Sequence, residues 1–107
     1  MGALFLPSII VLMAVVYLIH LDKPIHNARH YLGYTSLPVQ ARLARHKSGH
    51  GARLLKQANR LGIDYTVVRT WGCADQRQAR RLERKLKRGR NSPKLCPKCN
   101  KRLQQEK

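Results

Sequence analysis

The sequence predicts a small mixed α/β domain, and three features indicate it. Two short strand-like runs that each carry a tyrosine, residues 15–19 and 30–33, are joined by a polar, turn-like stretch, which is typical of an antiparallel hairpin. A third strand-like segment, IDYTVVRTW, covers residues 63–71. Segments with helical spacing of apolar residues lie between the hairpin and this strand, and again after it. A chain of 107 residues has room for one such domain and a tail.

The composition indicates a polyanionic partner. Twenty-two lysines and arginines stand against five acidic residues, so the formal net charge at pH 7 is +17. Such a field attracts phosphate backbones or anionic membranes and carries no information about the fold. A hydrophobic content of 43%, with clear periodicities, favours a folded core over a disordered basic tail. Three cysteines, an odd number, fit a reducing compartment better than a secreted protein, and we expect a cytoplasmic location.

An apolar run over residues 3–21 is long enough to resemble a membrane-spanning helix or a signal segment. Its second half is the first strand of the hairpin, and one segment cannot both span a bilayer as a helix and pair in a sheet. A chain beginning at Met13 would start directly at the strand. We therefore interpret residues 1–12 as an extension from a misplaced start, with a membrane anchor or an ordered extra helix as the alternatives.

The segment after the hairpin is expected to form two helices. Ser36 and Pro38 supply a cap and a first-turn proline, so a helix is predicted over residues 39–47. Leu37, Ala41 and Ala44 lie on one side of this segment. A cationic ridge is predicted beside the hairpin's end, formed by Arg42, Arg45 and His46, with a solvated basic face as the ordinary alternative. A second helix is predicted over residues 52–61, with Gly62 as its stop and an inward set of Leu54, Leu55, Ala58 and Leu61.

The third strand is predicted to end at Gly72, and a last helix is predicted to follow it. Strand alternation would place Tyr65, Val67, Arg69 and Trp71 on one side of the sheet. Asp75 and Gln78 resemble a capping box that opens a helix within residues 74–88. The predicted inward stripe of this helix is Ala79, Leu82 and Leu86.

Glu83 is the only carboxylate in the interior of this last helix, and it lies at the edge of the inward stripe. One interpretation is a surface ion pair with Lys87 or Arg80, which stabilises a helix by only about 0.3 to 0.5 kcal/mol. The other is a ligand for a hard metal ion, because Mg²⁺ is commonly held through one or two carboxylates plus substrate phosphate.

Four motifs taken in order resemble those of the GIY-YIG nuclease family. They are Val15-Val16-Tyr17, then Tyr31-Leu32-Gly33 with Thr35, then Arg42-Leu43 with His46, and Glu83 in the last helix. Together they cover most of residues 15–91. The first motif lacks the glycine and isoleucine of the family's pattern, and the second has Leu32 in place of isoleucine. Either tyrosine alone would be an ordinary strand aromatic, whereas the order and spacing of the motifs indicate the family.

The resemblance implies a fold and an activity. The fold is a small α/β (α+β) domain over residues 13–91, with a three-stranded antiparallel sheet flanked by helices. A basic, CxxC-containing tail over residues 92–107 follows it. The activity is hydrolysis of DNA phosphodiester bonds with one divalent metal, Mg²⁺ or Mn²⁺, and without a small-molecule cofactor. Because no base-reading module is recognisable, we expect selectivity for DNA structure rather than for sequence.

The resemblance also implies roles for individual residues. Tyr17 would lie near the attacking water as a candidate general base, and Tyr31 would position the scissile phosphate or share that role. Arg42 would stabilise the charge of the phosphate. Glu83 would hold the metal, and His46 would bind phosphate or accept a proton. A tyrosine acts as a base only if a metal or cation lowers its pKa from about 10, which Arg42 and the metal are expected to do.

Further residues are expected to contact the DNA: Arg45, Lys47, Arg53 and Asn91. Asn91 lies where the family often places a polar residue near the phosphate, although its loop, residues 89–94, is equally typical of a turn.

Cys96 and Cys99 have zinc-knuckle spacing, but a structural zinc needs four ligands and only one CxxC is present. Cys73 and a histidine such as His50, or a second chain, could complete such a site. The simpler interpretation is a pair of reduced structural thiols.

Two functions of other classes remain open at this level. A non-catalytic basic protein that binds nucleic acid would use the same charge without needing Glu83. A membrane-anchored basic protein would need residues 1–12. The oligomeric state does not follow from these patterns.

Overall fold

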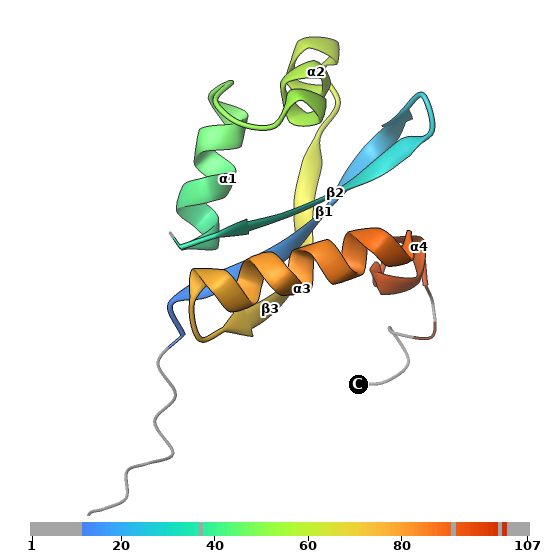
Figure 1. Ribbon diagram of the computed structural model, residues 1–107. Helices are drawn as coiled ribbons and strands as arrows, with labels where there is room; N and C mark the ends of the chain where they lie inside the picture. The colour runs from blue at the N-terminus through green and yellow to red at the C-terminus, as the bar shows by residue number, and fades with distance from the viewer. Residues whose placement is uncertain (1–11, 37, 91, 101, 103–107) are drawn as a thin grey trace, which may run out of the picture.

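The computed structural model describes residues 12–36, 38–90, 92–100 and 102 of the chain. Three strands form one antiparallel sheet in the order β2-β1-β3, and helices cover both of its faces (Figure 1). In chain order the elements are β1 Ala14–Ile25, β2 Ala28–Thr35, α1 Val39–Lys47, α2 Arg53–Leu61, β3 Tyr65–Cys73, α3 Gln76–Gly89 and α4 Ser92–Leu95. This arrangement confirms the predicted fold class. Within the described ranges, no helix has both the length and the apolar character needed to cross a membrane. The predicted extension, residues 1–12, lies outside them apart from Leu12.

The hairpin is longer than the sequence indicated. β1 continues through Lys23 and Pro24 to Ile25, so only His26 and Asn27 of the turn-like stretch between the two runs form the turn. His26 adopts the left-handed region with φ of 56°, which supplies the positive φ of a tight hairpin turn. Pro24 is tolerated because β3 pairs with β1 only as far as Leu21, so no neighbour on that side needs its missing N–H.

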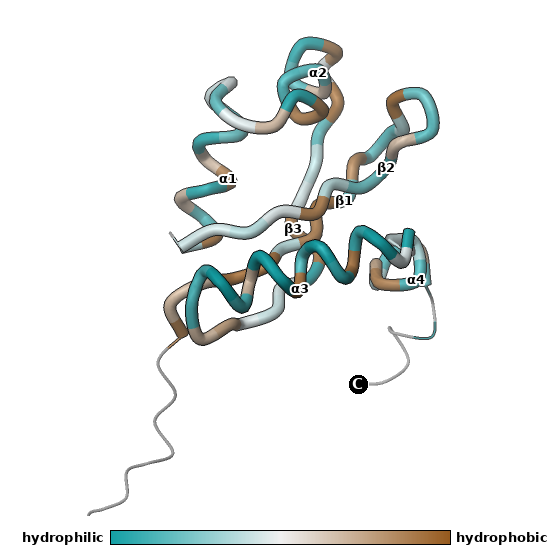
Figure 2. The backbone as a smooth tube through the Cα atoms, in the orientation of Figure 1, coloured by the Kyte–Doolittle hydropathy of each residue, from teal (hydrophilic) through white to brown (hydrophobic). Residues whose placement is uncertain are grey.

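The central strand β1 supplies side chains to two separate cores, one on each face of the sheet. Val16 and Leu18 pack against α3, whereas Tyr17, Ile19 and Leu21 pack against α1 and α2. All five side chains are buried because β1 has a strand on each side and helices over each face. The middle of β1 is accordingly hydrophobic, while α3 is mostly hydrophilic along its outer side (Figure 2).

A bulge in β3 breaks the alternation that the sequence suggested. Leu18 pairs with Arg69 and the next residue of β1 pairs with Val67, so Val68 has no partner across the ladder. As a result Val67 packs in the core under α1 and α2, while Val68 and Trp71 pack under α3. The prediction that residues 65, 67, 69 and 71 share one side is therefore wrong. The strand also continues through Gly72 instead of ending there.

The helix bounds agree with the predictions within one or two residues. On α1 the residues turned to the core are Val39, Leu43 and His46, whereas Ala41 and Ala44 are exposed. The larger apolar side chains are buried in preference to alanines, because they remove more apolar surface from water. Leu37 lies outside the described residues.

Both later helices end or begin as predicted. Gly62 caps α2 in the left-handed region with φ of 73°, which leaves Leu61, expected to be inward, 58% exposed at the turn. At α3 the Asp75 carboxylate accepts a hydrogen bond from the Gln78 backbone N–H at 2.8 Å, which confirms the predicted cap. The inward stripe of α3 is also confirmed and consists of Ala79, Leu82 and Leu86.

Candidate active site

A cleft of about 530 Å³ opens where the end of β2, helix α1 and helix α3 come together. Eight described residues line it: Tyr31, Tyr34, Thr35, Ser36, Arg42, Arg45, Gln76 and Glu83. Four of them, Tyr31, Arg42, Arg45 and Glu83, were predicted site residues. The fold thus gathers a phenol, guanidinium groups and a carboxylate from segments far apart in the sequence.

Tyr17 and His46 form a buried pair that is not part of the cleft lining. The Tyr17 hydroxyl lies 2.9 Å from Nε2 of His46, and each side chain is 1% exposed. The Tyr31 ring packs beside both, with ring centroids 6.2 Å from Tyr17 and 5.7 Å from His46. Gly51 borders the other edge of the imidazole and leaves no room for a Cβ atom. The three rings form one cluster in which only Tyr31 reaches the cleft.

Gly33 permits the two tyrosines to approach each other. A Cβ atom at this position would lie 2.8 Å from the Tyr17 hydroxyl and 2.8 Å from Cε2 of Tyr31. Because Gly33 pairs directly with Tyr17 across the ladder, a side chain there would enter the space that both phenols use. The glycine of the second motif is therefore explained by close packing.

The protonation states of the cluster follow from its burial. Burial raises the pKa of the Tyr17 phenol, against the opposing effect of Arg42. Burial also raises the pKa of Tyr31 to about 12. The chain's own groups thus keep both tyrosines as neutral phenols, and the lowering expected from Arg42 is outweighed by burial. In contrast, burial together with the charges of Arg42 and Arg45 lowers the pKa of His46, so its imidazole is neutral at neutral pH.

Arg42 and Glu83 present opposite charges at the cleft. The Nε atom of Arg42 is buried and has no hydrogen-bond partner within the part of the chain that the structure describes. An unpaired buried donor of this kind is costly unless a ligand satisfies it. The Glu83 side chain is 16% exposed, and its carboxylate lies 3.4 Å from the ammonium of Lys87, so the ion pair considered from the sequence is present.

The cleft can accept a hard metal ion. Its described lining offers the Glu83 carboxylate and the oxygens of Tyr31, Tyr34, Thr35 and Ser36. Oxygen atoms of this kind suit Mg²⁺ or Mn²⁺. One carboxylate with adjoining space for a phosphate is a common arrangement for Mg²⁺ in phosphoryl chemistry, so the residues fit the metal.

Other predicted residues lie elsewhere. The Lys47 ammonium lies over the Tyr65 ring, 4.0 Å from its centroid, and Arg53 lines a separate surface depression with Lys56 and Arg60. Asn91 lies outside the described residues.

The sequence reasoning missed Gln76, Tyr34 and Ser36 as lining residues. A signal existed for Gln76, because it precedes Glu83 by two helical turns and so shares its face of α3. It also missed a basic surface along α3, whose exposed members are Arg77, Arg80, Arg81, Arg84, Lys85, Lys87 and Arg88.

The cysteines of the tail have partners other than those predicted. Cys96 and Cys99 lie beside His20 and His30 of the hairpin. Cys73 packs in the core under α3, and His50 contacts Ser48 after α1. Neither belongs to the group around the CxxC, so the suggestion that Cys73 and His50 could complete a site with Cys96 and Cys99 is wrong.

The fold and the cleft suit a phosphate-containing substrate, because an α+β domain here carries a cleft that presents guanidinium groups together with a carboxylate. The chain belongs to the GIY-YIG family, because residues 13–95 match the GIY-YIG catalytic domain. This match confirms the resemblance drawn from the motifs, and it identifies the class of the protein as a nuclease that acts on DNA. Comparisons with curated proteins and with solved structures gave no match.

Proposed function

We propose that the protein is a metal-dependent endonuclease that hydrolyses DNA phosphodiester bonds and selects its substrate by DNA structure. The observation that carries this proposal is the convergence of Tyr31, Arg42 and Glu83 in one cleft. A protein that only bound nucleic acid would use the basic surface and would not require a carboxylate there, since a carboxylate repels phosphate unless a metal intervenes.

Glu83 would hold the metal, Mg²⁺ or Mn²⁺, at the α3 side of the cleft. When bound, the metal supplies positive charge to the phosphate and lowers the pKa of a coordinated water. The Glu83–Lys87 pair is compatible with this role, because the Lys87 side chain is 54% exposed and its ammonium can move into solvent when a metal takes its place.

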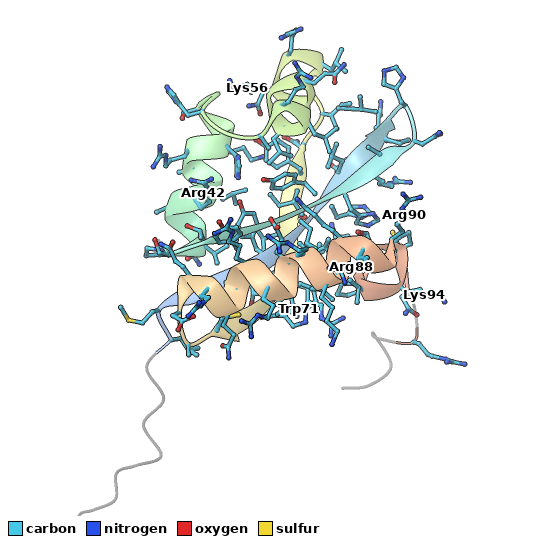
Figure 3. The ribbon with its side chains drawn as sticks, in the orientation of Figure 1. Arg42, Lys56, Trp71, Arg88, Arg90 and Lys94 are labelled. Atoms are coloured by element: carbon cyan, nitrogen blue, oxygen red, sulfur yellow. The ribbon has the colours of Figure 1, made fainter. Side chains whose placement is uncertain are left out.

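Arg42 and Tyr31 would bind the scissile phosphate. Arg42 lines the cleft from α1, and its guanidinium group offers several N–H donors that suit phosphate oxygens. Arg42 is labelled on α1 in Figure 3. Tyr31, kept protonated by its raised pKa, would donate a hydrogen bond to the phosphate. Charge building up on the phosphate oxygens in the transition state is then met by donors already in place.

Tyr17 and His46, the buried pair, would accept the proton of the attacking water. We assign the general base to Tyr17 acting with His46, because the neutral imidazole can accept the phenol's proton over their 2.9 Å contact. The 1% exposure of His46 favours this proton-accepting role over direct phosphate binding. Tyr17 is equally buried and does not line the cleft, so the water's proton would reach it through the hydroxyl of Tyr31, which packs beside Tyr17 and lines the cleft, and would end on His46.

The DNA would lie along α3 and cross the cleft. The seven exposed basic residues of α3 continue beyond the helix into Arg90 and Lys94, which lie near its C-terminal end (Figure 3). Arg45 at the cleft continues this basic surface onto α1. These groups suit contacts to the phosphate backbone, which position DNA without reading its sequence.

The substitution Glu83→Gln tests the function, with Lys87→Gln as the matched control from the same ion pair. Both variants are assayed with Mg²⁺ or Mn²⁺, under single-turnover conditions, on branched, flapped, single-stranded and duplex DNA. We expect Glu83→Gln to bind DNA and to lose cleavage, whereas Lys87→Gln cleaves like the wild type at saturating protein. Wild-type protein that cuts none of these substrates, or a Glu83→Gln variant with wild-type cleavage, would overturn the proposal.

A further inference from the structure

We infer that His20, His30, Cys96 and Cys99 form a tetrahedral zinc site that fastens the tail to the hairpin. One ligand atom from each residue lies within 4.8 Å of every other, so a single ion can reach all four. The set combines two thiols and two imidazoles, which is one of the common donor sets of structural zinc.

The separations between the ligand atoms support a single ion at their centre. With Zn–N bonds of about 2.0–2.1 Å and Zn–S bonds of about 2.3 Å, the edges of a tetrahedron are about 3.4 Å for N–N and about 3.6 Å for N–S. The Nδ1 atom of His20 lies 3.4 Å from Nε2 of His30 and 3.4 Å from Sγ of Cys96. Sγ of Cys99 lies 3.7 Å from that His20 atom and 3.5 Å from Nε2 of His30.

These contacts have a better explanation as metal-ligand edges than as hydrogen bonds. A hydrogen bond between two imidazole nitrogens is shorter than the 3.4 Å that separates His20 and His30. Moreover, Nδ1 of His20 lies close to three of the cluster's polar atoms at once, whereas a neutral imidazole nitrogen either donates or accepts one bond. A metal ion among the four atoms removes this conflict.

The donor set also discriminates between metals. Thiolate and imidazole ligands select zinc over Mg²⁺, so this site and the oxygen-lined cleft call for different ions. A two-iron cluster held by the same residue types would keep the sulfur pair and the nitrogen pair on separate irons. The 3.4 Å between the Cys96 sulfur and the His20 nitrogen instead places them around one ion. Two thiolates with one Zn²⁺ make a neutral centre, as befits a site that includes the fully buried Cys96.

The positions of the ligands indicate a structural role. His20 and His30 face each other across the β1–β2 ladder, and Cys96 and Cys99 follow α4. Their separations from His20 are 76 and 79 residues, so the ion would join the ends of the domain. Four protein ligands leave no open position for a substrate, which is characteristic of structural zinc sites.

Metal analysis of the full chain, purified without a histidine tag or chelators, tests the site. We expect about one zinc per wild-type chain. The variants Cys99→Ser and His30→Gln should lose it, while Cys73→Ala and His50→Gln retain it as controls of the same residue types. These controls also test the alternative partners suggested by the sequence.

X-ray absorption of the wild-type protein gives a second measurement that does not depend on variants folding. We expect two sulfur and two nitrogen scatterers around zinc, and removal of zinc with a zinc-selective chelator in the presence of excess Mg²⁺ should lower the melting temperature. Wild-type protein without zinc while both thiols are reduced, a Cys96–Cys99 disulfide, a bound iron, or zinc retained by Cys99→Ser would each overturn the inference.

Discussion

The substitution Gly33→Ala should displace the cluster of aromatic rings without replacing any of the groups assigned to charge stabilisation or proton transfer. The added methyl would lie 2.8 Å from the Tyr17 hydroxyl and 2.8 Å from the Tyr31 ring. Comfortable separations between such atoms are about 3.5–4.0 Å, so each ring must move by about 0.7 Å or more. Overpacking of this kind costs about 1–3 kcal/mol in the free energy of unfolding. A displacement near 1 Å at a reacting group can reduce turnover by about 10²-fold.

Gly72→Ala is the matched control for this prediction. Gly72 is also a strand glycine, but the nearest atom to its added methyl would be Cδ1 of Leu12 at 2.6 Å, at the tip of a side chain that is 56% exposed and free to rotate away. Replacing a glycine by alanine also restricts the unfolded chain, which stabilises by about 0.4–1 kcal/mol where the backbone permits it. We therefore expect a neutral or slightly stabilising effect on unfolding and no effect on cleavage.

The two glycine variants are compared by urea denaturation and by single-turnover DNA cleavage at a temperature where both are folded. The expected pattern is a Gly33→Ala variant that is less stable and about 10²-fold slower, next to a Gly72→Ala variant that resembles the wild type. If Gly33→Ala kept the wild-type rate and stability, the packing of the two phenols would not set the geometry of the site, and the reasoning would fail.

Two further predictions concern the proton and the phosphate. Burial lowers the pKa of His46 below 6.5, and only its neutral form can accept the Tyr17 proton, so the cleavage rate should be at its plateau above pH 6.5 and should fall as the pH drops through the lowered pKa. His46→Gln should remove this loss of rate at acid pH and lower the plateau rate by about 10²-fold. A pH–rate profile that the substitution leaves unchanged would contradict the pairing of Tyr17 with His46. Arg42→Ala should reduce cleavage at saturating DNA by about 10²- to 10³-fold. Arg53, on a separate surface, should act differently: Arg53→Ala should weaken DNA binding about equally for all sequences and reduce the slope of log K against log salt by about 1. If Arg42→Ala and Arg53→Ala slowed the cleavage step equally, the scissile phosphate would not lie at Arg42.

The strands and helices were predictable because each segment has a clear hydrophobic periodicity and recognisable cap or turn residues at its ends. Asp75 with Gln78 opened a helix as expected, and Gly62 closed one. The cleft residues Tyr31, Arg42 and Glu83 were also found from the sequence, because their motifs keep a fixed order along the chain. These signals are local in the sequence, or they depend only on the order of the motifs along the chain, so they can be read without knowing how the elements pack.

The errors came from features that only packing decides. The bulge at Val68 shifts the faces of β3, and a period-of-two pattern cannot reveal where a strand gains an extra residue. On α1 the sequence placed Arg42 and His46 on one face and predicted a cationic ridge there, but it did not show that His46 is buried against the sheet and that of the two only Arg42 reaches the cleft. A basic residue type predicts exposure on average, and here the fold overrides that average.

The histidine partners of the CxxC were missed although the register contained them. Once Tyr17 pairs with Gly33, the same ladder places His20 opposite His30. What the sequence could not supply was the path of the tail after α3, which brings Cys96 and Cys99 to this pair.

The distance along the chain between the hairpin and the CxxC has a consequence for the order of folding. The hairpin closes a short loop, with His20 and His30 only 10 residues apart, whereas joining His20 to Cys99 closes a loop of 79. By the logarithmic dependence of closure entropy on length, the longer loop costs about 2 kcal/mol more. We therefore expect β1 and β2 to pair early, and the tail to dock last. A chain refolded without zinc should show a slow or incomplete final phase confined to α4 and the CxxC.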